Sequence, residues 1–138
     1  MIRRAGPQDM EAVFEIRRVV FIEGQNVPEE EERDALDADA IHLIAFDDQK
    51  PVGTARLLVN QGTGKIGRVA VLDEMRGQGL GKALMNAAVA ELRKEGVTKA
   101  KLAAQTHALA FYEALGFLAE GPEFLDAGIL HRNMTRAL

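Results

Sequence analysis

Three alternating glycines, Gly77, Gly79 and Gly81, separate two segments of different periodicity. Residues 65–72 are rich in Val and Ile and are expected to form a strand, whereas residues 79–94 carry apolar side chains at helical spacing. Glycine destabilises a helix by about 1 kcal/mol relative to alanine, so glycines at a helix start suggest that a ligand approaches the backbone. The segment therefore predicts a strand, a tight turn and a helix N-terminus around a bound group.

The rest of the pattern predicts an α+β fold in a single domain spanning residues 1–138. A first helix is expected near Asp9, whose carboxylate can cap it. The acidic residues 29–39 are expected to form a loop or a short exposed helix. Further elements are expected in the order strand, strand, strand, helix, strand, short helix and two strands, at residues 41–46, 52–59, 65–72, 79–94, 99–105, 108–115 and in the tail.

Two residue types that form acyl-enzyme intermediates are missing, since the chain contains neither Cys nor Ser. Acyl transfer through a Ser or Cys intermediate is therefore excluded. The three histidines do not have metal-ligand spacing, so no metal site is expected. The net charge of -4 argues against nucleic-acid binding. No apolar run predicts a membrane span or a secretion signal, and a cytoplasmic protein is expected.

The glycine-rich segment has the features of an anion site, because free N–H groups at a helix N-terminus attract negative charge. Arg76 and Lys82 add positive charge at its two ends, and a pyrophosphate is the expected ligand. A P-loop requires Ser or Thr after Gly-Lys, but Ala83 follows Lys82. The dinucleotide fingerprint requires a third glycine at the position of Lys82. Both motifs are therefore excluded.

The spacing Arg-x-x-Gly-x-Gly, from Arg76 to Gly81, resembles the acetyl-CoA-binding motif of the GCN5-related N-acetyltransferase (GNAT) family. The order of expected elements resembles this family over nearly the whole chain. The resemblance implies a mostly antiparallel sheet with helices on both faces, splayed at the coenzyme-binding strand. It implies that coenzyme contacts come from that strand and from the loop, namely from Val69, Ala70, Val71, Arg76, Gly77, Gln78, Gly79, Leu80, Gly81 and Lys82.

Residues 110–117 resemble the family's Phe/Tyr-x-x-Leu-Gly-Phe helix end, which implies that Tyr112 lies near the coenzyme sulfur as a catalytic residue. Residues 17–21, 104–105 and 128–131 further resemble a small, little-characterised bacterial subgroup of GNAT acetyltransferases. The acceptor side is then expected to include Arg17, Phe21, Gln105 and His131. The family often pairs through sheet edges, so the resemblance also implies that a homodimer can form.

The expected reaction is direct transfer of the acetyl group of acetyl-CoA to an amine, with a small molecule as the favoured acceptor. A lysine-like amine is about one part in a thousand neutral at pH 7, so a base should assist. Glu23 is ranked first, ahead of His42, Asp73, Glu74 and His131. Two alternatives remain open: a non-catalytic acyl-CoA-binding module of the same fold, and a nucleotide-binding protein of another class.

Overall fold

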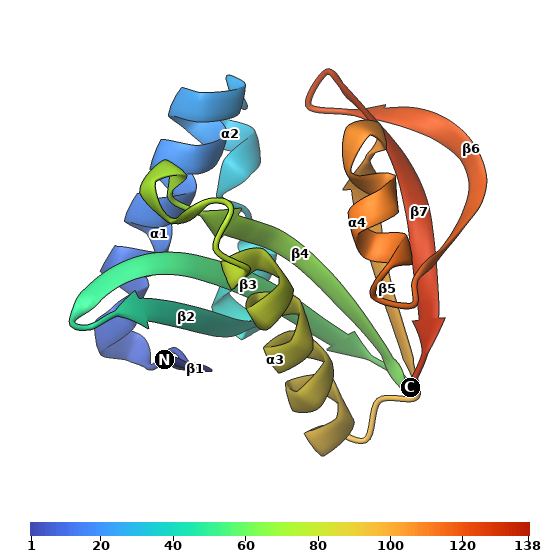
Figure 1. Ribbon diagram of the computed structural model, residues 1–138, viewed down its shortest axis with the longest axis horizontal. Coiled ribbons are helices and arrows are strands. Elements are labelled where there is room, and N and C mark those ends of the chain that lie inside the picture. Colours follow the sequence, from blue (N-terminus) through green and yellow to red (C-terminus); the bar gives the residue numbers. More distant parts are fainter.

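Seven strands form one sheet in the order β1-β2-β3-β4-β5-β7-β6 (Figure 1). The computed structural model describes residues 1–138. All neighbouring strands are antiparallel except β4 and β5, which run parallel. The strands are β1 (Ile2–Arg4), β2 (Ile41–Asp47), β3 (Lys50–Asn60), β4 (Thr63–Val71), β5 (Lys99–Gln105), β6 (Leu118–Asp126) and β7 (Ile129–Ala137). The predicted mixed sheet is confirmed, with β1 as an additional edge strand.

The main helices lie at the places in the strand order that the sequence predicts. The π-helical segment η2 continues the first helix. The α-helices are α1 (Met10–Arg17), α2 (Glu29–Glu32), α3 (Leu80–Lys94) and α4 (Leu109–Glu113). The other helical segments are η1 (Pro7–Asp9), η2 (Arg18–Glu23), η3 (Ala35–Asp39), η4 (Asp73–Met75) and η5 (Thr106–Ala108). None of the helices combines the length and the apolar character that crossing a membrane requires.

Helices cover both faces of the sheet, as expected. On one face Leu84 and Leu92 of α3 are fully buried in a cluster with Leu43 and Leu57 of the sheet. On the other face Ile16 of α1 packs in a smaller cluster with Ala70 of β4. Burial of a Leu or Ile side chain contributes about 1.5–3 kcal/mol, so both contacts hold the helices against the sheet. Residue alternation along each strand supplies the two apolar faces.

Strands β4 and β5 separate after a short parallel pairing of residues 63–65 with residues 99–101. They diverge beyond this point, and Figure 1 shows the two strands as the arms of a V. A β-bulge lies on the β4 arm, because Thr54 pairs with Ala70 while Arg56 pairs with Gly67. Arg68 lies in this bulge with a φ of 51°. The predicted splay is thus present together with a bulge in β4, and the sheet opens at its centre.

The start of the first helix differs from the expectation. The Asp9 carboxylate does not cap α1. It accepts a hydrogen bond from the Gly6 N–H at 2.8 Å and pairs with Arg3 at 2.6 Å. These contacts lower the pKa of Asp9, first through the Arg3 hydrogen bond and then through the Gly6 hydrogen bond. Asp9 therefore ties β1 to the start of η1, because a nearby guanidinium offers a stronger partner than a helix N–H.

Candidate active site

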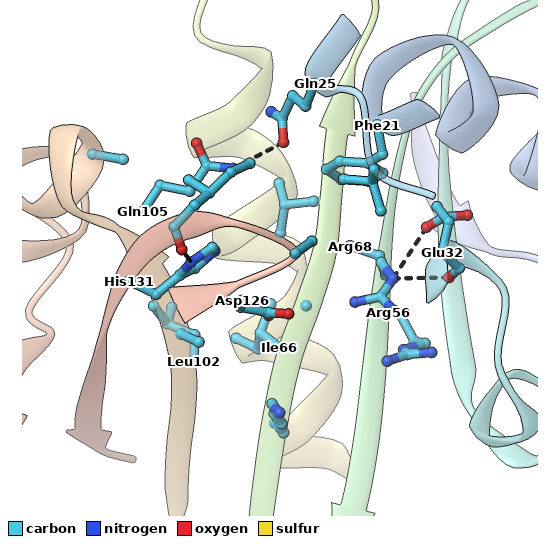
Figure 2. Close-up of a pocket in the computed structure, with 18 of the residues that line it drawn as sticks. Phe21, Gln25, Glu32, Arg56, Ile66, Arg68, Leu102, Gln105, Asp126 and His131 are labelled. Carbon is cyan, nitrogen blue, oxygen red and sulfur yellow. Dashed lines mark hydrogen bonds and ion pairs between the residues drawn. The ribbon is translucent and has the colours of Figure 1, made fainter. Parts of the chain in front are cut away.

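The divergence of β4 and β5 opens a cavity of 310 Å³. Val69 of β4 and Leu102 of β5 lie on its two strand walls, and Tyr112 of α4 also lines it. Segment η2 and α2 close one side, while the β6–β7 hairpin closes another with Asp126 and His131 (Figure 2). Elements far apart in the sequence therefore meet around one hollow of small-molecule size.

The glycine-rich loop leads from η4 into α3. Gly77 and Gly79 have φ values of 77° and 81°, a left-handed conformation that residues with a Cβ rarely adopt. No acceptor in the protein pairs with the backbone N–H groups of residues 77–82. Arg76 forms only an exposed ion pair with Asp73, at 3.1 Å. The loop thus presents a row of free donors and a cation that can change partners, the features of an anion site.

The edge of β4 that faces β5 is also free. Beyond Lys65 this edge has no strand partner, although β3 pairs with the opposite edge as far as Val71. The unpaired stretch includes Val69, Ala70 and Val71, and a bound chain with amide groups could add to it as a strand would. Gly81 at the start of α3 faces the Phe111 ring of α4, so the loop lies close to α4, although residues 76–82 do not line the cavity.

Tyr112 has its hydroxyl free of any hydrogen bond within the protein. Its ring is held edge-on between Phe111 and Phe117, at centroid distances of 5.0 and 6.4 Å. Burial raises the pKa of Tyr112, so the phenol is neutral at physiological pH. A neutral phenol that lines the cavity can donate a hydrogen bond to a bound group.

His131 lies on the hairpin wall of the cavity and is 9% exposed. Its Nδ1 lies 2.7 Å from the Ile129 carbonyl oxygen, and its ring stacks on Phe124 at 5.9 Å. A carbonyl only accepts, so Nδ1 carries the proton and the Nε2 of the neutral ring has a free lone pair. The structure therefore fixes one ring orientation with a basic nitrogen available.

The acidic segment contains a short and mostly exposed helix, as the sequence predicts, but Glu32 and the Asp37 side chain are buried in a network of ion pairs. Arg17 is fully buried and binds Glu32 and Asp37 at 3.0 and 2.8 Å. Arg56 binds Asp37 and Asp34, and Arg68 binds Glu32. Burial opposes ionisation of Asp37, but its hydrogen bonds and nearby arginines hold its pKa well below the usual range. The arginines explain the burial, because each supplies a countercharge.

Among the predicted acceptor-side residues, Phe21, Gln105 and His131 line the cavity. Gln105 donates a hydrogen bond to Gln25 at 2.9 Å and so joins the end of β5 to the segment after η2. Arg17 lies outside the cavity lining, with its guanidinium held in the buried network. Its position is structural, because every nitrogen of the guanidinium already has an acceptor.

Of the residues predicted as general bases, only His131 lines the cavity. Glu23 is exposed, pairs with Arg18 and does not line the cavity. His42 is buried beside α1 with its Nε2 at 3.0 Å from the Asp37 carbonyl. Asp73 and Glu74 pair with Arg76 and Lys50 at the surface. Segment η2, which carries Glu23, does border the cavity through Phe21, but the Glu23 side chain is exposed on the outer side of this segment.

Sequence reasoning missed four charged residues of the cavity: Arg56, Lys65, Arg68 and Asp126. Arg68 interrupts an otherwise apolar and glycine run in residues 66–71, and this interruption was the available signal. Asp126 carried no such signal, since it lies in a hairpin whose position over the cavity depends on the tertiary structure.

Comparison with known proteins agrees with this geometry. The family described as "Acetyltransferase (GNAT) domain" matches residues 10–138. An uncharacterized N-acetyltransferase of Bacillus subtilis, YjcF, is 38% identical over 130 residues, which cover 94% of this chain and 93% of that protein. The chain therefore belongs to the GNAT acetyltransferase family, a class of acetyl-CoA-dependent N-acetyltransferases.

Solved structures show the same fold. An acyl-CoA N-acyltransferase from Pseudomonas aeruginosa superposes with a TM-score of 0.87 and 33% identity, covering 99% of this chain and 98% of that chain. A protein of Lactobacillus plantarum superposes with a TM-score of 0.93 and 25% identity, covering 100% and 97%. The similarity extends over the entire sheet, so the splay between β4 and β5 belongs to a shared architecture.

Proposed function

We propose that this enzyme transfers the acetyl group of acetyl-CoA directly to the amine of a small molecule, without a covalent acyl-enzyme. The cavity carries this proposal, since it brings a neutral phenol, a free strand edge and a basic imidazole nitrogen to one hollow. The chain has no Ser or Cys to hold the acyl group. The amine nitrogen attacks the thioester carbonyl carbon, the carbon–sulfur bond breaks, and the thiolate leaves.

The coenzyme-binding surface proposed here consists of the loop from Arg76 to Lys82 and the β4 edge from Val69 to Val71. Free N–H groups of residues 77–82 suit a pyrophosphate, and the helix dipole of α3 adds about 0.3–1 kcal/mol. The β4 edge suits the amide groups of the pantetheine arm. Its bulge interrupts pairing with β3, and a freed N–H there would polarise the thioester carbonyl.

We expect Arg76→Ala to weaken acetyl-CoA binding by about 1–3 kcal/mol, because a charge-assisted hydrogen bond to phosphate is lost. The Asp73 pair is exposed and contributes little, so Arg76 can exchange it for the coenzyme. Calorimetric titration measures the change, and Arg93→Ala on the exposed side of α3 is the matched control. An unchanged dissociation constant would remove Arg76 from the coenzyme site.

His131 replaces Glu23 as the proposed general base. Glu23 pairs with Arg18 on the surface, whereas His131 lines the cavity with its Nε2 free. The neutral imidazole takes a proton from the ammonium form of the acceptor, directly or through one water molecule, and the neutral amine then attacks. Tyr112, across the same cavity, donates a hydrogen bond to the sulfur as negative charge develops there.

We expect His131→Gln to lower kcat about 100-fold with little change in coenzyme affinity, because an amide cannot accept the proton. The pH profile provides the second readout, since loss of the base should make the rate of the variant rise with pH as the free amine becomes more abundant. Glu23→Gln is the matched comparison and should retain activity. Loss of activity in Glu23→Gln alone would restore Glu23 as the base.

The overall reaction is tested by release of free thiol from acetyl-CoA in the presence of a panel of small amines. Amine-dependent thiol release, with acetylated amine detected by mass spectrometry, supports the proposal. Binding of acetyl-CoA without any turnover would instead support a non-catalytic acyl-CoA-binding module. Strong competition by ATP or NAD would point to a nucleotide-binding protein of another class.

A further inference from the structure

We propose that the acceptor is a small amine that also carries a carboxylate, and that Arg68 binds this carboxylate. This inference rests on the transferase activity proposed above and specifies its substrate class. It follows from the backbone position of Arg68, from its unused donor, and from the distribution of charge around the cavity.

The bulge in β4 turns Arg68 toward α2. Ile66 packs on the face of the sheet covered by α3, and regular alternation would direct residue 68 to that same face. The extra residue and the φ of 51° instead bring the guanidinium to Glu32. A left-handed conformation is unfavourable for a residue with a Cβ, and such conformations cluster at functional sites.

The guanidinium is fixed on one side and free on the other. Its Nε lies 3.1 Å from a Glu32 carboxylate oxygen, and its Nη2 lies 3.3 and 3.4 Å from the Glu31 carbonyl and the Asp34 carboxylate. Nη1 has no acceptor in the protein, although the side chain lines the cavity (Figure 2). A guanidinium held in this way presents a positioned donor, and a carboxylate is the partner that matches it.

Arg56 places a second guanidinium on the same wall. It is 5% exposed, pairs with Asp34 through Nη1 at 2.7 Å, and has a buried Nε without any hydrogen-bond partner. Burial, together with the charges of Arg56 and Arg17, lowers the pKa of Arg68. A bound anion would favour the charged form of Arg68 and offset this effect.

Three of the acidic residues near this wall are paired with arginines, and the fourth, Glu31, is exposed and has no ion-pair partner. Glu32, Asp34 and Asp37 each contact at least one arginine. The wall therefore offers no unpaired buried carboxylate to a second cationic group, which argues against a diamine acceptor. The opposite wall carries His131 and Asp126, and Figure 2 shows Asp126 between His131 and Arg68. An amine beside His131 and a carboxylate at Arg68 match these two walls.

Paired acceptors test the proposal. Glycine, β-alanine, 4-aminobutyrate, leucine and phenylalanine are each compared with the corresponding carboxamide, which keeps the amine but removes the negative charge. Thiol release gives kcat/KM, and calorimetry in the presence of coenzyme A gives acceptor binding without turnover. For the preferred acceptor we expect the carboxylate to exceed its amide about 10- to 100-fold in kcat/KM.

Arg68→Gln should remove this preference by lowering kcat/KM for the carboxylate 10- to 100-fold while leaving the amide nearly unchanged. Arg68→Lys retains the charge and should retain part of the preference, and Arg93→Gln on α3 is the control. If Arg68→Gln fails to fold, the ratio of kcat/KM for the carboxylate to kcat/KM for the amide in the wild-type enzyme still tests whether a carboxylate is preferred.

Equal or better use of the amides would overturn the inference and leave the transferase proposal standing. Absence of binding and turnover for every amino carboxylate in the panel would also overturn it. Failure of the proposed function is distinct from both, because it would appear as absence of acetyl-CoA binding or as absence of thiol release with any amine.

Discussion

Tyr112→Phe is expected to lower kcat by about 10²–10⁴-fold with little change in acetyl-CoA affinity. The substitution keeps the ring that packs between Phe111 and Phe117 and removes only the hydroxyl, which has no partner in the protein. The thiol of coenzyme A should have a pKa of about 8.5, and a phenol has a pKa of about 10. Full proton transfer from Tyr112 to the leaving thiolate is therefore uphill by about 2 kcal/mol. Burial raises the pKa of Tyr112 further, so hydrogen bonding to the sulfur accounts for most of the effect.

Steady-state thiol release measures kcat for this variant, and calorimetry measures the dissociation constant of acetyl-CoA. The thermal unfolding midpoint is the control, since removal of an unpartnered hydroxyl should leave stability nearly unchanged. Unchanged turnover in Tyr112→Phe would exclude the hydroxyl from the mechanism. A large loss of coenzyme affinity would instead assign Tyr112 to binding.

Arg17→Ala is expected to lower the free energy of unfolding by about 3–5 kcal/mol, because it removes one of the two arginines that pair with each of two buried carboxylates. Glu32 is 2% exposed, and the Asp37 side chain is 8% exposed. A loss of this size is a large fraction of the 5–15 kcal/mol that stabilises a typical domain. Urea titration followed by circular dichroism measures it.

The neighbouring arginine provides the matched control. Arg18 pairs with Glu15 and Glu23 at the surface, and exposed pairs contribute about 0–1 kcal/mol. Arg18→Ala should therefore lower the free energy of unfolding by less than about 1 kcal/mol. Similar losses of unfolding free energy in Arg17→Ala and Arg18→Ala would show that burial does not determine how much an ion pair contributes to stability. Retained stability in Arg17→Ala would contradict the assignment of Arg17 to a structural position.

The buried network also matters for the cavity, because it holds the acidic segment against the sheet. Glu32 contacts both Arg17 from α1 and Arg68 from β4. Loss of Arg17 therefore removes one of the two fixed partners of Glu32, and Arg68 loses part of its support. Arg17 is therefore a positioning residue that acts through Glu32, whereas Arg68 is the residue proposed to contact the acceptor.

Local sequence determined the elements that depend on periodicity and turn chemistry. The Val and Ile content of residues 65–72 predicted β4, the helical repeat predicted α3, and the glycines predicted the turn between them. The left-handed φ values of Gly77 and Gly79 confirm that glycine is needed there. These features follow from neighbouring residues alone, since backbone sterics and side-chain spacing act over a few residues.

Tertiary structure decided which charged side chains face the cavity. Glu23 and His131 were both candidate bases, and only the folded chain shows that Glu23 pairs with Arg18 while His131 lines the hollow. The acidic run from residue 29 to residue 39 has the composition of a solvated surface, yet Glu32 is buried because arginines from α1, β3 and β4 converge on this segment. Ion pairs between residues separated by 15 to 36 positions leave no periodic trace in a sequence, so only the fold reveals them.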